Sequence, residues 1–536
     1  MAHDPDNLFR SPIIGDLELP ADGSGDGATG AADDRQVPML VELNVRYPGG
    51  LDAVRRSFYE LWSEFEERAG GSWPDELTSV STVQPPVPNG LAIIAPKLYQ
   101  CVLSRSQVHE LVERDRQQAR AARSLPTIFR VWPDYTLTPQ IDRSAPTVKA
   151  DAAWRSYDAR GRNIVWAVID SGIDASHPHF AGLELGAEGR GEDQLKGLTS
   201  GLHRDFSYLV NPDDPARPAG SNDPPPSNAT ALQDDAGHGT HVAGIISGCT
   251  PDGMKPRVAS SNDPVDGGFV SREHATVLSG MAPACELVSL KVMRRTRQGT
   301  WITSSAAVIR ALTYLRTEVN IDPALLRVHG VNMSLGCEWK PEQYAAGQSP
   351  LCQSVNQLVA SGVVVVVSAG NYGARTTVGD TANTSASMGS ITEPAHAEDC
   401  IAVGSTHRDA PHAFGVTWTS GKGPTLDGRL KPDVVAPGEW IASAATGRIR
   451  AAAGLDPQPG MAAPASLLTY AEQSGTSMAA PHVSGVIAAF LSARPEFIGR
   501  PRQVKELLAR SATDLGRERY AQGAGLIDLM RMLANV

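Results

Sequence analysis

The stretch SGVVVVVSAGN at residues 361–371 contains five consecutive valines and ends on an asparagine. A β-branched run with no polar residue on either face is typical of a strand buried on both sides, as in a parallel sheet covered by helices. Similar strand-length runs lie at 163–170, 287–293 and 328–336, and helical spacing of apolar residues is found at 306–317. This alternation predicts an α/β domain with a doubly wound, mostly parallel sheet and helices on both faces.

The chain is long enough for two folded units, because its 536 residues exceed an ordinary single domain. Residues 1–36 are rich in Gly, Asp and Ala and are predicted to be a flexible leader. Strand-like and helical patterns over 37–140 predict a small α+β domain, and the α/β domain follows over 148–536. Three segments that interrupt it are interpreted as surface insertions, near 211–234, 249–274 and 443–470.

Composition and charge exclude several classes of protein. A net charge of −11 argues against nucleic-acid binding, which needs clustered positive charge. No apolar run approaches the roughly 18 residues of a membrane span, so no membrane partner is expected. The first twenty residues contain no secretory signal pattern, which makes the cytoplasm the default location and leaves export by a non-standard route open. The six cysteines contain no CxxC pair, and Cys337 and Cys352 are candidates for a disulfide only if the protein is exported.

Polar residues stand where several predicted strands end. Asp170, Ser334, Gly336 and Asn371 follow apolar runs, and Ser477 lies at the start of a long apolar helix. Working groups in an open α/β sheet gather where strands end and helices begin, so these residues are expected to face one crevice. Each has a structural explanation when taken alone, as a turn carboxylate, a loop former or a helix cap.

The stretch GHGTHVAG at 237–244 adds two histidines three residues apart. Positions i and i+3 share a helix face, so His238 and His241 could bind one metal ion. A metallohydrolase interpretation fits poorly, because HGTH lacks the Glu base of the HExxH motif. An acid, an imidazole, a hydroxyl and an amide donor are together the parts that acyl transfer requires.

Three motifs occur in the order Asp, His, Ser: AVIDSGID at 167–174, GHGTHVAG at 237–244 and SGTSMAAPHVSG at 474–485. In these motifs the chain resembles the subtilisin-like serine proteases, the subtilases or peptidase S8 family. Further segments resemble the family in the expected order, at 280–293, 332–336, 430–438 and 520–529. The resemblance covers roughly residues 148–536 and implies a subtilisin-like fold there.

The resemblance implies a serine endopeptidase that acts on protein or peptide substrates. Ser477 would be the nucleophile that forms an acyl-enzyme, His238 the general base and Asp170 the acid that orients it. The Asn371 side chain and the Ser477 amide would bind the oxyanion. The remaining implied site residues would pair as a strand with the substrate backbone, namely Ser334, Leu335 and Gly336.

Nearby polar residues are assigned other roles. Asp174 is predicted to make a local loop bond, and His241 to pack or make a structural hydrogen bond. Many secreted relatives carry an Asp calcium ligand at the position of His179, and the loop that completes their site is replaced here by the insertion beginning near Cys249. Calcium is therefore not carried over. Acidic clusters such as NPDD at 211–214 could still bind calcium weakly, but clustered surface Asp is usually only solvated. No metal is predicted at His177 and His179, and no other cofactor is predicted.

The 37–140 domain resembles, more loosely, the inhibitor propeptides of subtilases, on order and position alone. This resemblance implies inhibition in cis and cleavage near 135–147, whereas a retained regulatory or docking domain is the competing interpretation. For the whole chain, the alternative is a degenerate protease fold that acts as a binding or scaffold protein. That alternative predicts a missing triad or oxyanion residue, and none is missing.

Overall fold

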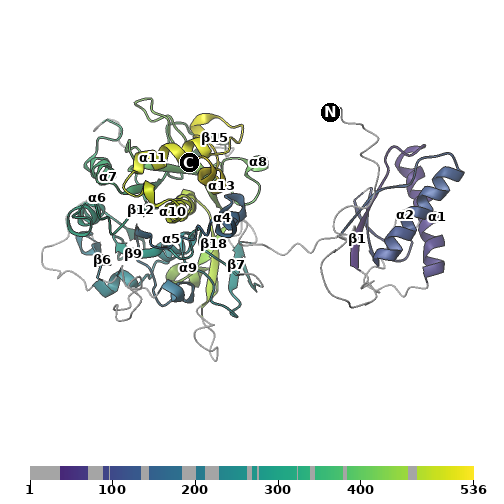
Figure 1. Ribbon diagram of the computed structural model, residues 1–536, viewed down its shortest axis with the longest axis horizontal. Helices are drawn as coiled ribbons and strands as arrows, with labels where there is room; N and C mark the ends of the chain where they lie inside the picture. The colour runs from purple at the N-terminus through teal and green to yellow at the C-terminus, as the bar shows by residue number, and fades with distance from the viewer. Residues whose placement is uncertain are drawn as a thin grey trace. The chain divides into compact units, whose positions relative to one another are not determined.

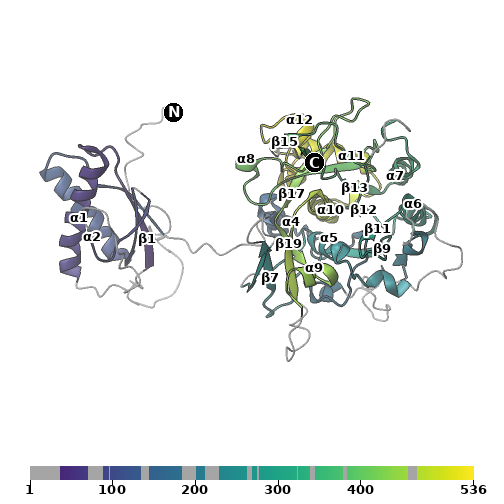
Figure 2. The same cartoon turned by 180° about the vertical axis from the view of Figure 1, so that it is seen from behind.

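The computed structural model contains two compact units, Met1–Pro139 and Gln140–Val536, and each is described by itself (Figures 1 and 2). The predicted leader at 1–36 lies outside the described residues. The described residues are 37–69, 88–95, 97–133, 144–183, 199, 201–211, 228–261, 268–274, 277–322, 324–338, 345–377, 383–456 and 468–536.

The N-terminal unit is an α+β fold, as predicted, with a four-stranded antiparallel sheet in the order β2-β3-β1-β4. Two helices lie together on one face of the sheet (Figure 1). Aromatic residues supply the largest side chains of the core between the helices and the sheet, where Phe58, Trp62 and Tyr99 are fully buried. The elements are β1 (Val37–Leu43), α1 (Gly50–Ala69), β2 (Ala92–Ala95), β3 (Leu98–Leu103), α2 (Arg105–Ala121) and β4 (Ile128–Pro133).

The second unit is built on a seven-stranded sheet in the order β17-β16-β13-β12-β5-β9-β6, and every pair of neighbours in it is parallel. The predicted parallel sheet is thereby confirmed. Its strands are β5 (Val165–Asp170), β6 (Arg204–Asp205), β9 (Glu286–Lys291), β12 (Gly330–Met333), β13 (Val364–Ser368), β16 (Ile401–His407) and β17 (Val434–Glu439).

Helices cover both faces of this sheet and create two separate hydrophobic cores. The valine run at 363–367 explains how one strand contributes side chains to both cores. Val364 and Val366 of β13 pack into the first core, whereas Val363, Val365 and Val367 pack into the second. The first core contains α4 (Ala150–Tyr157), α5 (His238–Ile246), α10 (Thr476–Ala493), α11 (Pro501–Ser511) and α13 (Leu529–Ala534), and the second contains α6 (Ser305–Tyr314) and α7 (Pro350–Ala360).

Helix α10 is long and apolar enough to cross a membrane by length and composition alone, but 83% of it is buried inside this unit. That burial is typical of the core helix of a globular fold. Close contact with α5 is possible because Gly485 has no side chain: a Cβ there would lie 2.6 Å from the Met281 Cβ and 3.0 Å from the Ile246 carbonyl oxygen.

The described residues of the predicted insertion near 249–274 include two strands that the sequence analysis did not predict. They are β7 (Arg257–Ser261) and β8 (Phe269–Glu273), which extend the pair β18 (Ile441–Ala444) and β19 (Thr469–Gln473) into a sheet of order β18-β19-β7-β8. Val258 and Ala259 of β7 are buried there. The sequence of β7 is short and rich in small residues, so it gave little indication of a strand. The strand forms because it pairs with β19, about 210 residues away in the chain.

The other two predicted insertions lie partly outside the described residues, at 212–227 and 457–467. Short elements complete the second unit, namely α3 (Ser144–Thr147), β10 (Arg294–Arg295), β11 (Trp301–Ile302), β14 (Ala374–Thr377), β15 (Asn383–Ala386), α8 (Pro411–Phe414), α9 (Gly447–Ala452) and α12 (Arg519–Gln522). Short 3₁₀-helices lie at Pro178–Leu183, Ser207–Leu209, Asn228–Leu232 and Pro495–Phe497, and a π-helical segment at Leu315–Val319 follows α6.

Candidate active site

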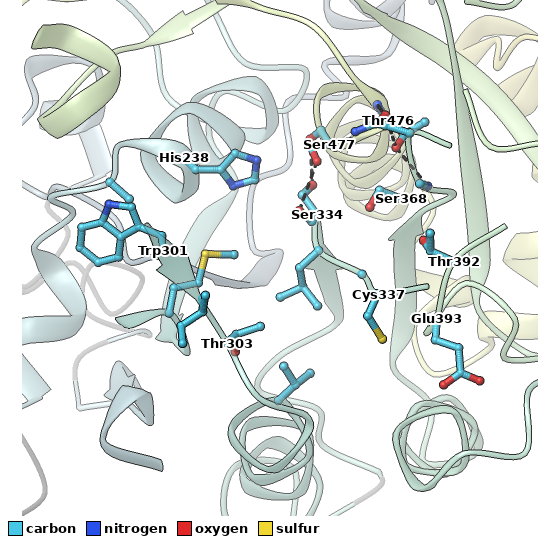
Figure 3. Close-up of a pocket in the computed structure, with 18 of the residues that line it drawn as sticks. His238, Trp301, Thr303, Ser334, Cys337, Ser368, Thr392, Glu393, Thr476 and Ser477 are labelled. Atoms are coloured by element: carbon cyan, nitrogen blue, oxygen red, sulfur yellow. Dashed lines mark hydrogen bonds between the residues drawn. The ribbon is translucent and has the colours of Figure 1, made fainter. Parts of the chain in front are cut away.

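A cleft of about 840 Å³ opens where the carboxyl ends of β12 and β13 meet the first turns of α5 and α10 (Figure 3). Among the predicted site residues, His238, Ser334, Asn371 and Ser477 line it, as do Leu335 and Gly336. Asp170 is the last residue of β5 and lies beneath His238. The strand ends therefore bring the predicted residues together, as the geometry of a doubly wound sheet requires.

Asp170 and His238 form a hydrogen-bonded pair. The Asp170 side chain is fully buried, and its Oδ1 lies 2.7 Å from the His238 Nδ1. The Ser171 amide donates to the same oxygen at 2.8 Å. A carboxylate accepts only, so the His238 Nδ1 carries the proton and the Nε2 of the neutral ring is left as an acceptor.

A second buried carboxylate, Asp234, holds the start of α5 in place. Its two oxygens accept from the amides of Gly237 and Thr240, both at 2.9 Å, and from the hydroxyls of Thr240 at 2.7 Å and Ser171 at 2.8 Å. The Ser171 hydroxyl in turn accepts from the Gly239 amide at 2.9 Å. The sequence reasoning missed Asp234, which lies four residues before the first residue of α5 and so outside the N-cap position, where Gly237 stands.

Gly237 and Gly239, on either side of His238, are each required for a different structural reason. Gly237 has φ +85°, a backbone conformation that L side chains rarely adopt. At Gly239 a Cβ would lie 2.2 Å from the Gly172 carbonyl oxygen, which means that only glycine lets α5 approach the end of β5. Both therefore serve to place His238 next to Asp170.

Two opposing effects set the basicity of His238. Burial lowers its pKa, but the charge of Asp170, the hydrogen bond to it and the charge of Asp234 outweigh burial, so the pKa of His238 lies above its ordinary value. Burial also raises the pKa of Asp234, against the four hydrogen bonds that favour its charged form.

Ser477 is the second residue of α10, and its hydroxyl makes a reciprocal contact with Ser334 (Figure 3). The Ser477 Oγ donates to the Ser334 carbonyl oxygen at 3.2 Å, and the Ser334 Oγ donates to the Ser477 carbonyl oxygen at 2.8 Å. Among the described residues no hydrogen bond joins Ser477 Oγ to His238. Rotation about the Cα–Cβ bond would turn the hydroxyl from Ser334 into the cleft.

Asn371 lies on an exposed turn after β13, and Thr476 fixes its amide. The Asn371 Oδ1 accepts from the Thr476 amide at 2.9 Å and from its hydroxyl at 3.1 Å. A backbone N–H can only donate, so the atom facing it must be the oxygen, and the Nδ2 donors point the other way. The hydroxyl of Thr476 also accepts from the Gly370 amide at 3.2 Å. Sequence reasoning did not single out Thr476.

The segment Ser334, Leu335 and Gly336 forms one wall of the cleft. Ser334 and Leu335 are buried. A Cβ at Gly336 would lie 2.8 Å from both the Glu393 carbonyl oxygen and the Thr392 hydroxyl, so the chain passes close to the 392–393 backbone. The cleft continues past Leu335 over an apolar surface made by Met293, Trp301, Ile302, Val308 and Leu351.

Comparison with known proteins agrees with this geometry. A model of the subtilase family matches residues 161–525. The chain belongs to the subtilase family. Subtilases are serine peptidases, so the family supports serine endopeptidase activity on protein or peptide substrates in general terms.

Similar subtilases come from several bacteria. Subtilisin E of Bacillus subtilis (strain 168) is 28% identical over 382 residues, which cover 71% of this chain and 68% of that protein. Subtilisin of Bacillus pumilus is 28% identical over 382 residues, covering 71% of this chain and 94% of that protein. Thermitase of Thermoactinomyces vulgaris is 27% identical over 339 residues, covering 63% of this chain and 78% of that protein.

The other polar residues of this subtilase's motifs lie away from the cleft. Asp174 accepts from the Ser176 amide at 3.0 Å, which is the local loop bond predicted for it. It also accepts from the Thr446 hydroxyl at 2.6 Å, a bond across 272 positions of the chain that was not predicted. His241 is fully buried, and its Nε2 lies 2.9 Å from the Ala471 carbonyl oxygen. Burial lowers the pKa of His241 to about 4.

His177 and His179 are buried in the same unit and bind protein atoms. The His177 Nε2 lies 2.9 Å from the Thr469 carbonyl oxygen, and the His179 Nδ1 lies 3.0 Å from the Tyr470 hydroxyl. Within the described ranges no group of three or more His, Cys, Asp or Glu residues could hold a metal ion. Cys337 and Cys352 are not joined by a disulfide; Cys337 is exposed and Cys352 is buried on α7.

Proposed function

We propose that this subtilase is an endopeptidase that cleaves peptide bonds through an acyl-enzyme on Ser477. The observation that carries the proposal is the buried Asp170 bonded to His238, in a cleft that Ser477 and Asn371 also line. An oriented base, a hydroxyl and an amide donor at one strand edge form an acyl-transfer site.

In the first half of the reaction, the Ser477 hydroxyl turns away from the Ser334 carbonyl and attacks the substrate carbonyl carbon. The His238 Nε2 accepts the hydroxyl proton, and the C–O bond forms as the carbonyl π electrons move to oxygen. Collapse of the intermediate breaks the C–N bond, and His238 returns the proton to the leaving amine. Water then repeats these steps on the ester and releases the acid.

Asp170 has two functions in this scheme. Its carboxylate keeps the proton on the Nδ1 of His238, and it stabilises the imidazolium that forms during attack. The first turn of α5 would otherwise disfavour that positive charge, since a helix N-terminus carries partial positive charge. Burial of Asp170 strengthens both effects, because water screens the pair poorly.

Asn371 and the Ser477 amide would stabilise the oxyanion. The Asn371 Nδ2 is the branch not bound by Thr476, and it has no need to reorganise during the reaction. Loss of such a donor lowers kcat by about 10² to 10³, the size found for an asparagine donor in a subtilisin. Ser334, Leu335 and Gly336 would hold the substrate backbone as an added strand, which gives affinity with little side-chain preference.

The test is Ser477→Ala against wild type, with Ser474→Ala as the matched control, since Ser474 is an exposed serine of the same motif. Casein hydrolysis and fluorophosphonate labelling are measured for all three. Wild type and Ser474→Ala should be active and labelled, and Ser477→Ala neither. Equal labelling of Ser477→Ala and wild type would refute the assignment, and a wild type that stays unlabelled and inactive after its N-terminal unit has been cut off would favour the scaffold alternative, which no present observation supports.

We further propose that no metal or other cofactor takes part, because a protein group is available for every proton transfer and for the developing charge. The N-terminal unit, by its order in the chain and its own compact core, is proposed to inhibit the peptidase in cis. Intact mass measurement of wild type beside Ser477→Ala tests this second proposal. A cut near 135–147 that occurs only in wild type would support it, and full activity of an uncut chain would contradict it.

A further inference from the structure

The turn at 370–373 carries Asn371 and is held from two sides. On one side, Thr476 binds the Asn371 Oδ1 and the Gly370 amide. On the other side, the loop at 418–422 pairs with the same turn: the Gly421 amide donates to the Gly370 carbonyl oxygen at 2.8 Å, and the Gly373 amide donates to the Thr419 carbonyl oxygen at 2.9 Å. Neither loop residue had a role in the sequence analysis.

Lys422 closes this second side with its ammonium group. The Nζ donates to three backbone carbonyl oxygens, those of Gly373 at 3.0 Å, Trp418 at 2.9 Å and Ser420 at 3.2 Å. Hydrogen bonds from a charged donor are roughly twice as strong as neutral ones. All three donor positions of the ammonium are thereby used on one junction between the turn and the loop.

The junction is too tight to rearrange cheaply while the ammonium is present. A Cβ at Gly373 would lie 1.8 Å from the Ser420 carbonyl oxygen and 2.6 Å from the Lys422 Nζ. Three carbonyl dipoles that converge on one point repel one another, and a positive charge at that point converts the repulsion into attraction. Burial lowers the pKa of Lys422, and within the described ranges no Asp or Glu forms a salt bridge with it, so the carbonyl groups offset its lost hydration.

We infer that Lys422 is a positioning residue for the oxyanion donor: its ammonium fixes the turn at 370–373 and so keeps the Asn371 amide aimed at the carbonyl that Ser477 attacks. This inference rests on the proposed function. Asn371 itself is exposed, so packing does not hold its backbone. A catalytic donor must stay within about 0.5 Å of its productive place, and Thr476 alone binds only one end of the side chain.

The test is a double-mutant cycle of Lys422→Met and Asn371→Ala, with kcat and KM measured on a peptide nitroanilide well below each variant's melting temperature. Met keeps the length of the aliphatic stem and removes the charge and the donors. We expect Lys422→Met to lower kcat by about 5- to 20-fold, less than the 10²- to 10³-fold loss from removing the donor itself, with KM changed less than about twofold, since ground-state binding does not use the donor.

In the Asn371→Ala background, Lys422→Met should lower kcat by less than about twofold, because residues that act through one group are not additive. Lys422→Arg keeps the charge and should restore most of kcat. The matched control is Lys505→Met: Lys505 also donates to two backbone carbonyl oxygens, those of Glu398 at 2.9 Å and Cys400 at 2.8 Å, and pairs with Asp433, but none of these partners is on the turn at 370–373. It should lose stability and keep kcat.

If Lys422→Met lowers kcat by the same factor whether or not Asn371 is present, the inference is overturned, while the proposed peptidase activity stands. An unchanged kcat in Lys422→Met, or a Lys505→Met loss of the same size, would also overturn it. If wild type is no more active than Ser477→Ala, the proposed function and the inference fail together. If Lys422→Met folds poorly, Lys422→Arg decides the question. A Lys422→Arg protein that folds normally but has a kcat as low as that of Asn371→Ala would contradict the positioning role.

Discussion

Replacement of His241 by Gln should flatten the acid dependence of stability. Burial holds the pKa of His241 at about 4, below its ordinary 6.5. As pH falls from 6.5 toward 4, the unfolded chain takes up the proton first, so the folded state loses stability over that window. At pH 4.5 the difference amounts to two pH units at about 1.36 kcal/mol each, less a small term for folded molecules already protonated, or about 2.5 kcal/mol.

A Gln at this position has an amide that can still donate to the Ala471 carbonyl oxygen, as the His241 Nε2 does. It does not titrate. His241→Gln should therefore be somewhat less stable than its parent at pH 7.5, because its shape differs, yet should lose about 2.5 kcal/mol less stability than the parent on going to pH 4.5. Buried histidines that do not interact with His241 contribute equally to both proteins and cancel in the comparison. His238 and His482 do interact with it, since their charges also lower the pKa of His241.

The assay is urea unfolding of both proteins at pH 7.5 and pH 4.5, in the Ser477→Ala background so that self-digestion cannot distort the curves. Tryptophan fluorescence reports the unfolding of both units, because Trp62 and Trp166 are each fully buried. The N-terminal unit is identical in the two proteins, so its contribution cancels in the comparison. Free energies come from linear extrapolation. Parallel losses of stability in the two proteins would refute the reasoning, because they would mean that His241 takes up its proton equally in the folded and unfolded states.

Three further predictions concern the cleft and the thiols. Asp170→Asn should lower kcat about 10⁴-fold without unfolding the protein, because the wrong tautomer of His238 would be favoured; circular dichroism and nitroanilide kinetics check this. The value of kcat/KM should rise with pH as His238 loses its proton, and Asp234→Asn should move that rise to lower pH, since the charge of Asp234 raises the pKa of His238; an unmoved pH profile would argue against it. N-ethylmaleimide should label the exposed Cys249 and Cys337 in the folded protein, with Cys249 slowed because partial burial raises its pKa, and the four buried cysteines only after denaturation; peptide mass spectrometry counts the labelled sites.

Much of the fold followed from local patterns. The valine run predicted a strand buried on both faces, and β13 occupies that place in the sheet. Asp170, His238 and Asn371 were found because each stands at the end of an apolar run or inside a recognisable motif. Each of these patterns spans only about ten neighbouring residues, so it can be recognised without knowing what packs against it.

The supporting residues could not be found in this way. Thr476 binds Asn371 across 105 positions of the chain, and the Lys422 ammonium meets Gly373 across 49. A lysine in a loop or a threonine before a serine looks the same in sequence whether or not a distant carbonyl faces it. The β7 strand was not predicted for the same reason, because it is ordered by pairing with β19 and not by its own small residues.

The five valines at 363–367 also determine how the second unit can open. Neighbouring side chains alternate between the two cores, so neither core can come apart without freeing the strand that the other needs. Local opening of one half should therefore be rare compared with opening of the whole. In deuterated water, amides of β13 and of β12 and β16 beside it should exchange last and together, and the two faces of the sheet should behave as one cooperative block.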